Sequence, residues 1–198
     1  MTKVFVGFNF SSDSIFSRKI VGFRKRFDPK FNHYSFPHMS MLAPIEVLDG
    51  DIQDLQETLK EELETFFYGP SQRPKLGFTG IGIYQHKRKN ILYLNPHYST
   101  DLEYCSEIVV DICKSFADKK IKYKENKKQF LPLGVFTNEQ DFELVTEQAK
   151  LEFTSFNQMP IESISLYYKK MGIWYEKEVL VDFEQNVADL LQLNELAI

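Results

Sequence analysis

The chain has 198 residues, 43% of them hydrophobic, and carries 24 basic against 28 acidic side chains, for a net charge of −4. This length suits one domain with a sizeable core, or two small lobes that share one. The charge balance gives no electrostatic reason to expect tight non-specific binding to duplex nucleic acid. A small anionic ligand would need only a local positive site. The basic runs 23–30 and 117–128 are candidates for it, although such runs are more often solvated surface.

Nothing in the sequence predicts a membrane segment. No stretch approaches the roughly 18 continuous apolar residues of a membrane-spanning helix. The N-terminal MTKVFVGFNF alternates like a β-strand and lacks the charged and apolar regions of a signal peptide. We therefore expect a cytoplasmic protein with no membrane association.

Strand and helix patterns alternate through the first half of the chain. Residues 3–9 alternate as a strand, and residues 11–27 begin with capping serines and continue with apolar side chains at helical spacing. Next come a strand, an amphipathic helix with a Gly-Pro stop, and two strands joined by a polar turn: 37–47, 51–69, 75–85 and 90–96.

The second half repeats this plan. A helix over 97–120 begins with a Ser-Thr-Asp sequence that mirrors the Ser-Ser-Asp start of the first helix. It is followed by a strand, a helix, a hairpin around Met171-Gly172 and a last helix: 129–136, 138–152, 163–170 with 174–183, and 184–196. No low-complexity linker separates the halves. We therefore predict one bilobal domain over residues 1–198, with two strand–helix–strand lobes sharing a cleft.

Two stretches with a similar pattern of apolar residues lie on predicted strands at corresponding places in the two halves. The first, SFPHMSML, covers residues 35–42, and the second, QFLPLGVF, covers residues 129–136. Because side chains alternate along a strand, His38 and Ser40 should point into the cleft together while Met39 points away. The paired strands are expected to face each other across the cleft.

This layout resembles the 2H phosphoesterase superfamily, whose members include the 2′-5′ RNA ligase-like proteins and the cyclic phosphodiesterases. The resemblance rests on PHMSML in the first motif strand, the GIGIY strand, LGVF in the second motif strand and SISLYYKK near the end. His-x-Ser alone would be weak, because so short a pattern arises by chance. The resemblance implies an α+β fold of two pseudo-symmetric lobes, with antiparallel-rich sheet, outer helices and a central cleft.

The resemblance also implies a chemistry. Opening a 2′,3′-cyclic phosphate needs one group to take a proton from water and another to give a proton to the departing ribose oxygen, and two imidazoles suit that exchange. In the family, each motif supplies a histidine and a hydroxyl that hydrogen-bonds the phosphate. His38 and Ser40 match the first motif and are the expected catalytic residues.

The second motif departs from the family pattern. Aligning LGVF with the family's leucine-glycine ending puts Phe130 at the histidine position and Pro132 at the hydroxyl position. Neither can move a proton, and proline also lacks the backbone donor. No histidine occurs after His97, so a shifted alignment does not restore the pair. The scaffold is predicted to be of the two-histidine type with one histidine present.

Several assignments have a structural alternative. His38 could be a core histidine bonded to a backbone carbonyl, although the layout favours the cleft. Phe130 could be simple core packing or a base-stacking platform. On the SISLYYKK strand either Tyr167 or Tyr168 should face the cleft, and we expect Tyr168; with Phe130 and Pro132 it completes the predicted substrate-binding residues. The remaining histidines, His33, His86 and His97, are expected on the surface.

The sequence predicts no metal or cofactor. Cys105 and Cys113 fall in one predicted helix, where eight residues span about 12 Å, too far for a disulfide. The four histidines form no metal-binding spacing. Free structural thiols in a reducing compartment are expected.

Three functions remain open at this point. The first, which we favour, is a slow phosphodiesterase acting on a nucleotide or RNA end, with His38 as the single acid or base. The second is an inactive member that binds nucleotide or RNA, and the third is a protein-interaction scaffold. We expect the protein to act as a monomer.

Overall fold

The computed structural model describes residues 1–12, 14–31, 38–67, 73–86, 89–117, 129–154 and 156–183. Its helices and strands follow one another in the chain as β1 (Thr2–Phe10), α1 (Ile15–Phe27), β2 (His38–Ser40), β3 (Ile45–Val47), the 3₁₀ turn η1 (Asp49–Asp51), α2 (Ile52–Phe66), β4 (Lys75–His86), β5 (Lys89–His97), α3 (Thr100–Phe116), β6 (Leu131–Phe136), α4 (Glu139–Glu152), β7 (Phe156–Lys170) and β8 (Ile173–Asp182).

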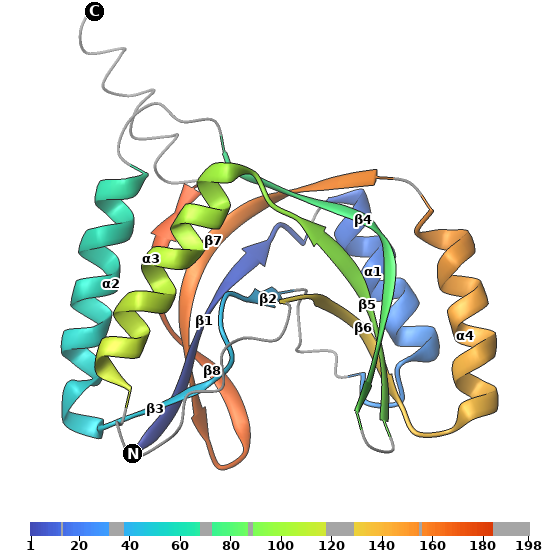
Figure 1. The fold of residues 1–198 in the computed structure, drawn as a ribbon, viewed down its shortest axis with the longest axis horizontal. Helices are drawn as coiled ribbons and strands as arrows, with labels where there is room; N and C mark the ends of the chain where they lie inside the picture. The colour runs from blue at the N-terminus through green and yellow to red at the C-terminus, as the bar shows by residue number, and fades with distance from the viewer. Residues whose placement is uncertain are drawn as a thin grey trace, which may run out of the picture.

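The strands form one antiparallel sheet of eight strands, in the order β2-β1-β7-β4-β5-β6, with β3 also on β1 and β8 also on β7. Strand β7 joins the two halves of the sheet. Its residues 156–160 pair with β4, and its residues 161–170 pair with β1 or β8. The sheet bends into an arch with the helices on the outside (Figure 1). We call the surface of the sheet that faces away from the helices the inner face.

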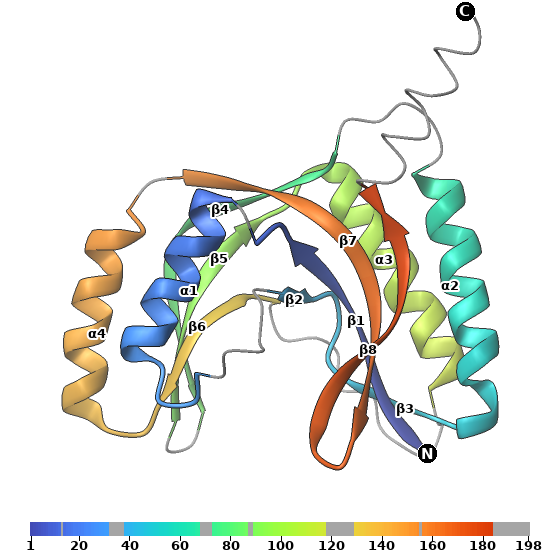
Figure 2. The same ribbon diagram turned by 180° about the vertical axis from the view of Figure 1, so that it is seen from behind.

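The helices cover the two halves of the arch in a crossed arrangement. Helices α2 and α3 contact each other, and α2 contacts β8, whereas α1 and α4 both contact β6 in the other half. Figure 2 shows α1 and α4 together on one side and α2 and α3 on the other. Helix α1 therefore follows β1 in the chain but packs in the opposite half, so the two strand–helix–strand units interlock. The predicted α+β class with antiparallel strands, two lobes and outer helices is confirmed.

Local sequence explains why the elements begin where they do. Ser14 caps α1 by accepting the backbone N–H of Ser17 at 2.9 Å, and the helix then buries Phe16, Ile20 and Phe23 along one stripe. In β1, alternate side chains point outward to the helices. Val4, Val6 and Phe8 are fully buried in the core, which leaves the residues between them on the inner face.

Two predicted strands differ from the observed ones. The strand expected over 37–47 is two short strands, β2 and β3, because residues 41–44 between them end in Pro44, which has no backbone donor for a ladder. Strand β7 begins at Phe156 instead of residue 163, because its first five residues pair with β4. The predicted helix over 184–196 lies outside the described residues, as does the Gly-Pro stop at the end of α2. None of the helices in the described ranges is long and apolar enough to cross a membrane.

Candidate functional site

His38 and Ser40 lie side by side on the inner face. In the β1–β2 ladder His38 is opposite Asn9 and Ser40 is opposite Gly7, whereas Met39 between them is fully buried in the core. His38 and Ser40 are both half-buried. The short strand β2 thus presents an imidazole and a hydroxyl on one surface, as alternation along a strand requires.

The His38 ring is held against two aromatic rings. Its centroid lies 5.8 Å from that of Phe5 and 5.6 Å from that of Tyr167, with interplanar angles of 21° and 25°. Phe5 and Tyr167 stack on each other at 4.7 Å, and Trp174 meets Phe5 edge-on at 4.8 Å. Aromatic packing of this kind restricts the orientation of the imidazole.

A hydrogen-bond cluster centred on Asn9 adjoins this stack. The Tyr167 hydroxyl donates to Asn9 Oδ1 at 2.5 Å. Asn9 Nδ2 lies 2.9 Å from Ser163 Oγ, 2.8 Å from Ser165 Oγ and 3.2 Å from Glu176 Oε1, and its two N–H groups are shared among these three acceptors. Burial, followed by the nearby Glu176 charge, raises the pKa of Tyr167 above its ordinary range. Tyr167 is therefore a neutral phenol at neutral pH.

The expectation that Tyr168 faces the cleft is wrong. Tyr168 is opposite Val4, a fully buried residue, and packs against the core on the helix side of the sheet. Tyr167 is opposite Phe5 and reaches the inner face. Because side chains alternate along a strand, one of these two tyrosines had to face inward. Leu166 and Ile164 are buried on the helix side, and Tyr168 shares their side of the strand, so Tyr167 is the one on the inner face.

Three aromatic side chains, from β4, from β5 and from the residue directly before β6, form an aromatic wall on the inner face. The Phe130 ring stacks on Tyr93 with centroids 4.5 Å apart, and the Tyr84 centroid lies 6.4 Å from that of Phe130. Pro132 is the ladder partner of Tyr93, whereas Leu131 is buried toward the helices. Phe130 and Pro132 alternate with the buried Leu131 and so share the inner face, and neither carries a proton-transfer group.

Tyr98 connects the two motif strands. Its hydroxyl donates to Gln129 Oε1 at 2.7 Å, directly before Phe130, and lies 4.0 Å from Met39 Sδ in β2. Burial, followed by the Glu103 charge, raises the pKa of Tyr98, so its hydroxyl remains a donor. Tyr98 therefore contacts both β2 and the segment that leads into β6, which are the two ends of the strand order.

The two arginines of the first basic run within its helix, Arg24 and Arg26, lie beside carboxylates. In the run 23–30, Arg24 lies 3.5 Å from Asp28, and Arg26 binds both carboxylate oxygens of Glu152 at 2.8 and 2.9 Å. In these pairs the guanidinium groups interact with carboxylates on the helix side of the sheet. The run 117–128 lies outside the described residues except for Ala117.

The other histidines and the two cysteines lie outside this site or outside the described residues. His97 is exposed, as expected, and meets Phe156 edge-on at 5.9 Å; His33 and the His86 side chain lie outside the described part. Cys105 and Cys113 are free and buried on α3, and burial raises the pKa of each thiol to about 12. Within the described ranges no group of three or more His, Cys, Asp or Glu side chains could hold a metal ion.

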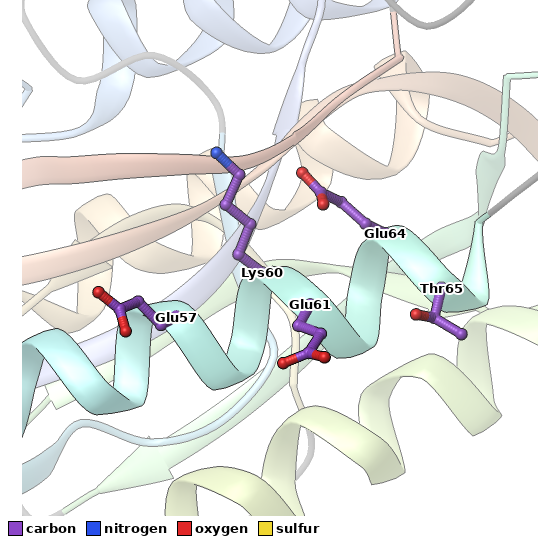
Figure 3. A pocket seen from close by; sticks show the side chains of 5 residues that line it. All are labelled: Glu57, Lys60, Glu61, Glu64 and Thr65. Atoms are coloured by element: carbon purple, nitrogen blue, oxygen red, sulfur yellow. The ribbon is translucent and has the colours of Figure 1, made fainter.

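A hollow elsewhere on the surface does not suit a phosphate ester. It measures about 550 Å³, lies along α2 and is open to solvent. Figure 3 shows the side chains that line it: Glu57, Lys60, Glu61, Glu64 and Thr65. Three carboxylates against one ammonium give the hollow a negative potential that repels anions.

Sequence reasoning missed three residues of the site. Asn9 sits in a strand that reads as plain alternation, Glu176 sits in a hairpin, and Tyr98 precedes a helix cap. The available signal was the polar Asn9 among the hydrophobic residues of β1, because a half-buried amide needs hydrogen-bond partners. Its partners come from β7 and β8, more than 150 residues away, so their identity required the fold.

Comparison with known proteins identifies the fold. No protein-family model matches the sequence, and no curated protein matches it either. A solved structure described as a phosphoesterase is similar to this chain with a TM-score of 0.52 and 9% identity, over 90% of this chain and 96% of that one. Usb1 from Kluyveromyces marxianus gives a TM-score of 0.46 and 10% identity, over 88% of this chain and 96% of that one. The chain therefore has a phosphoesterase-like α+β fold.

Proposed function

We propose that the protein is a 2H phosphoesterase-like enzyme that binds a nucleotide or RNA-end phosphate ester on the inner face and hydrolyses it slowly. The observation that carries the proposal is the placement of His38 and Ser40 together on this face, on a strand that Tyr98 connects to Gln129, the neighbour of Phe130. The similarity in fold to a solved phosphoesterase supports the scaffold. The residue roles rest on the site itself.

The proposed chemistry uses one imidazole. In opening a 2′,3′-cyclic phosphate, water attacks phosphorus, the bond from phosphorus to one ribose oxygen breaks, and that oxygen takes up a proton. His38 performs one of the two proton transfers, Ser40 hydrogen-bonds a non-bridging phosphate oxygen, and solvent performs the other transfer. Loss of one acid–base catalyst typically lowers the rate about 10²–10⁴-fold, so slow turnover is expected.

A second candidate is a binder without catalysis. Phe130 stands where the family has its second histidine and is stacked on Tyr93 at 4.5 Å, an arrangement suited to stacking a base. In this version His38 and Ser40 recognise the phosphate and the aromatic wall holds the base. No metal or cofactor takes part in either version. We further propose that residues 1–198 act as one monomeric domain in the cytoplasm.

Hydrolysis of 2′,3′-cyclic nucleotides tests the proposal. The wild type should turn over slowly, with a rate that follows a single ionisation in the range where imidazoles titrate. His38→Ala should abolish this rate, whereas His97→Ala, on an exposed histidine outside the site, should not. A rate that persists in His38→Ala would exclude His38 as the catalyst.

Binding separates the two candidates. A binder should show no turnover above the blank, yet its affinity for cyclic or linear nucleotides should fall in Ser40→Ala and in Phe130→Ala. The second loss should be about 1–3 kcal/mol if a base stacks there. A protein that neither binds nor hydrolyses any nucleotide tested would contradict both candidates and favour the interaction scaffold.

A further inference from the structure

The orientation of the Asn9 amide is fixed by a carboxylate. A carboxylate has only acceptor atoms, so the group of Asn9 that faces the Glu176 carboxylate at 3.2 Å is the donor Nδ2 and not Oδ1. The serine hydroxyls of Ser163 and Ser165 would tolerate either orientation, because each can donate or accept. Glu176 therefore determines which end of the Asn9 amide faces Tyr167.

This orientation makes the Tyr167 oxygen an acceptor toward its surroundings. Because Oδ1 of Asn9 faces Tyr167, the phenol hydroxyl donates its one hydrogen bond to Asn9, at 2.5 Å. The lone pairs of the Tyr167 oxygen remain for another partner. Burial and the Glu176 charge raise the pKa of Tyr167, which keeps this arrangement in place at neutral pH.

The cluster is also unfavourable to a phosphate. Glu176 is exposed, and no lysine or arginine of the described residues forms an ion pair with it. A carboxylate beside an acceptor oxygen repels anions and attracts O–H donors. Asn9, at the centre of the cluster, is directly opposite His38 in the β1–β2 ladder. The Asn9 cluster and the residues of the proposed phosphate site, His38 and Ser40, thus lie on neighbouring strands.

We propose that Tyr167, Asn9 and Glu176 form a hydroxyl-accepting subsite that binds a ligand hydroxyl on the carbon next to the one that carries the phosphate. The inference rests on the proposed function, because it takes His38 and Ser40 as the phosphate site. In a ribonucleoside 3′-monophosphate the 2′-hydroxyl has this position. A 2′,3′-cyclic phosphate has both oxygens esterified and offers no such donor. The subsite therefore favours the ring-opened ribose ester over the cyclic and 2′-deoxy forms.

Calorimetric binding of three ligands to the full chain tests this subsite. The ligands are adenosine 3′-monophosphate, its 2′-deoxy analogue and adenosine 2′,3′-cyclic phosphate. The wild type should bind the ribose monoester about 5- to 10-fold more tightly than the deoxy analogue, as one additional hydrogen bond provides. Tyr167→Phe keeps the ring that stacks on His38 and removes the oxygen. It should therefore lose this preference while its affinity for the deoxy analogue stays the same.

Two further variants make the test specific. Tyr168→Phe removes a hydroxyl from the next residue of β7, on the helix side, and should keep the full preference. Glu176→Gln should reduce the preference, because an amide no longer fixes Asn9 or attracts a donor as strongly. Equal affinity of the wild type for ribose and deoxyribose monoesters, or a preference that survives Tyr167→Phe, would overturn the subsite and leave the proposed function standing. Failure of the wild type to bind any of the three ligands would overturn both.

Discussion

At the scale of single residues, the inner face depends on glycines that leave room for rings. A Cβ at Gly7 would lie 3.3 Å from Phe5 Cε2, and a Cβ at Gly82 would lie 2.4 Å from Tyr93 Cζ. The first contact is tight and the second is an overlap. Gly82 therefore lets the Tyr93 ring lie flat on β4, where it supports Phe130.

Gly82→Ala should displace the Tyr93 ring and loosen its stack on Phe130. Overpacking of this kind costs about 1–3 kcal/mol of the free energy of unfolding, which urea denaturation measures. Gly22→Ala is the matched control, since nothing lies within 4 Å of its Cβ and it sits inside α1. That substitution should stabilise the protein by about 0.5–1 kcal/mol. A Gly82→Ala protein as stable as the wild type would contradict the placement of the Tyr93 ring.

At the scale of elements, the β7–β8 hairpin shows a conflict between turn geometry and sequence. Both turn residues have positive φ, 49° at Met171 and 84° at Gly172. Glycine adopts this conformation without cost, whereas methionine does not. Met171 is 92% exposed, so packing gives no compensation for its backbone strain. The hairpin itself brings Glu176 to Asn9 and therefore positions part of the site.

Met171→Asn should stabilise the protein by about 0.5–1 kcal/mol, because asparagine tolerates positive φ and Asn-Gly is the favoured two-residue turn. Thermal unfolding followed by circular dichroism measures the gain. Met171→Val should lower the melting temperature, since a β-branched residue is strained most in this region. If both substitutions changed the melting temperature in the same direction, the turn geometry would be wrong.

At the scale of the whole molecule, the arch is closed by contacts between segments far apart in the chain. Strand β7 joins the halves through its pairing with β1 and β4, and Tyr98 links the motif strands from opposite edges. Four protic side chains have perturbed titration in this fold: the buried thiols Cys105 and Cys113, and the half-buried phenols Tyr98 and Tyr167. Each has its pKa raised, first of all by burial.

The protein should lose stability in alkali. The folded chain keeps these protons at pH values where the unfolded chain releases them, so the free energy of unfolding falls as pH rises. For the thiols the loss begins near the ordinary pKa of 9.0 and extends to about 12. Urea midpoints between about pH 8 and pH 11 measure the effect. The variant with Cys105→Ala and Cys113→Ala should show a shallower decline, and a midpoint independent of pH would contradict the burial of these groups.

Much of this fold was predictable from periodicity, and the reasons for the misses are physical. Helix α1 and the Met171-Gly172 turn follow from local signals, namely a serine cap and turn residues. The inner-face position of His38 follows from alternation once β2 is recognised. The choice between Tyr167 and Tyr168 depended on which phase of β7 meets the core, and the Asn9 cluster depended on pairings across the whole chain. The first has a local signal, because the apolar Ile164 and Leu166 share the alternation phase of Tyr168, whereas the second is not encoded within a short window of sequence.

The central claim is that a scaffold with two motif positions carries one motif imidazole, His38 on β2, and has Phe130, directly before β6, at the other motif position. Its most direct test is the hydrolysis rate of a 2′,3′-cyclic nucleotide in the variant with Phe130→His and Pro132→Thr, with and without His38→Ala. We predict that the double substitution raises the rate about 10²–10⁴-fold over the wild type, and that adding His38→Ala removes the gain. A folded double variant no faster than the wild type, or a gain that persists without His38, would contradict the claim.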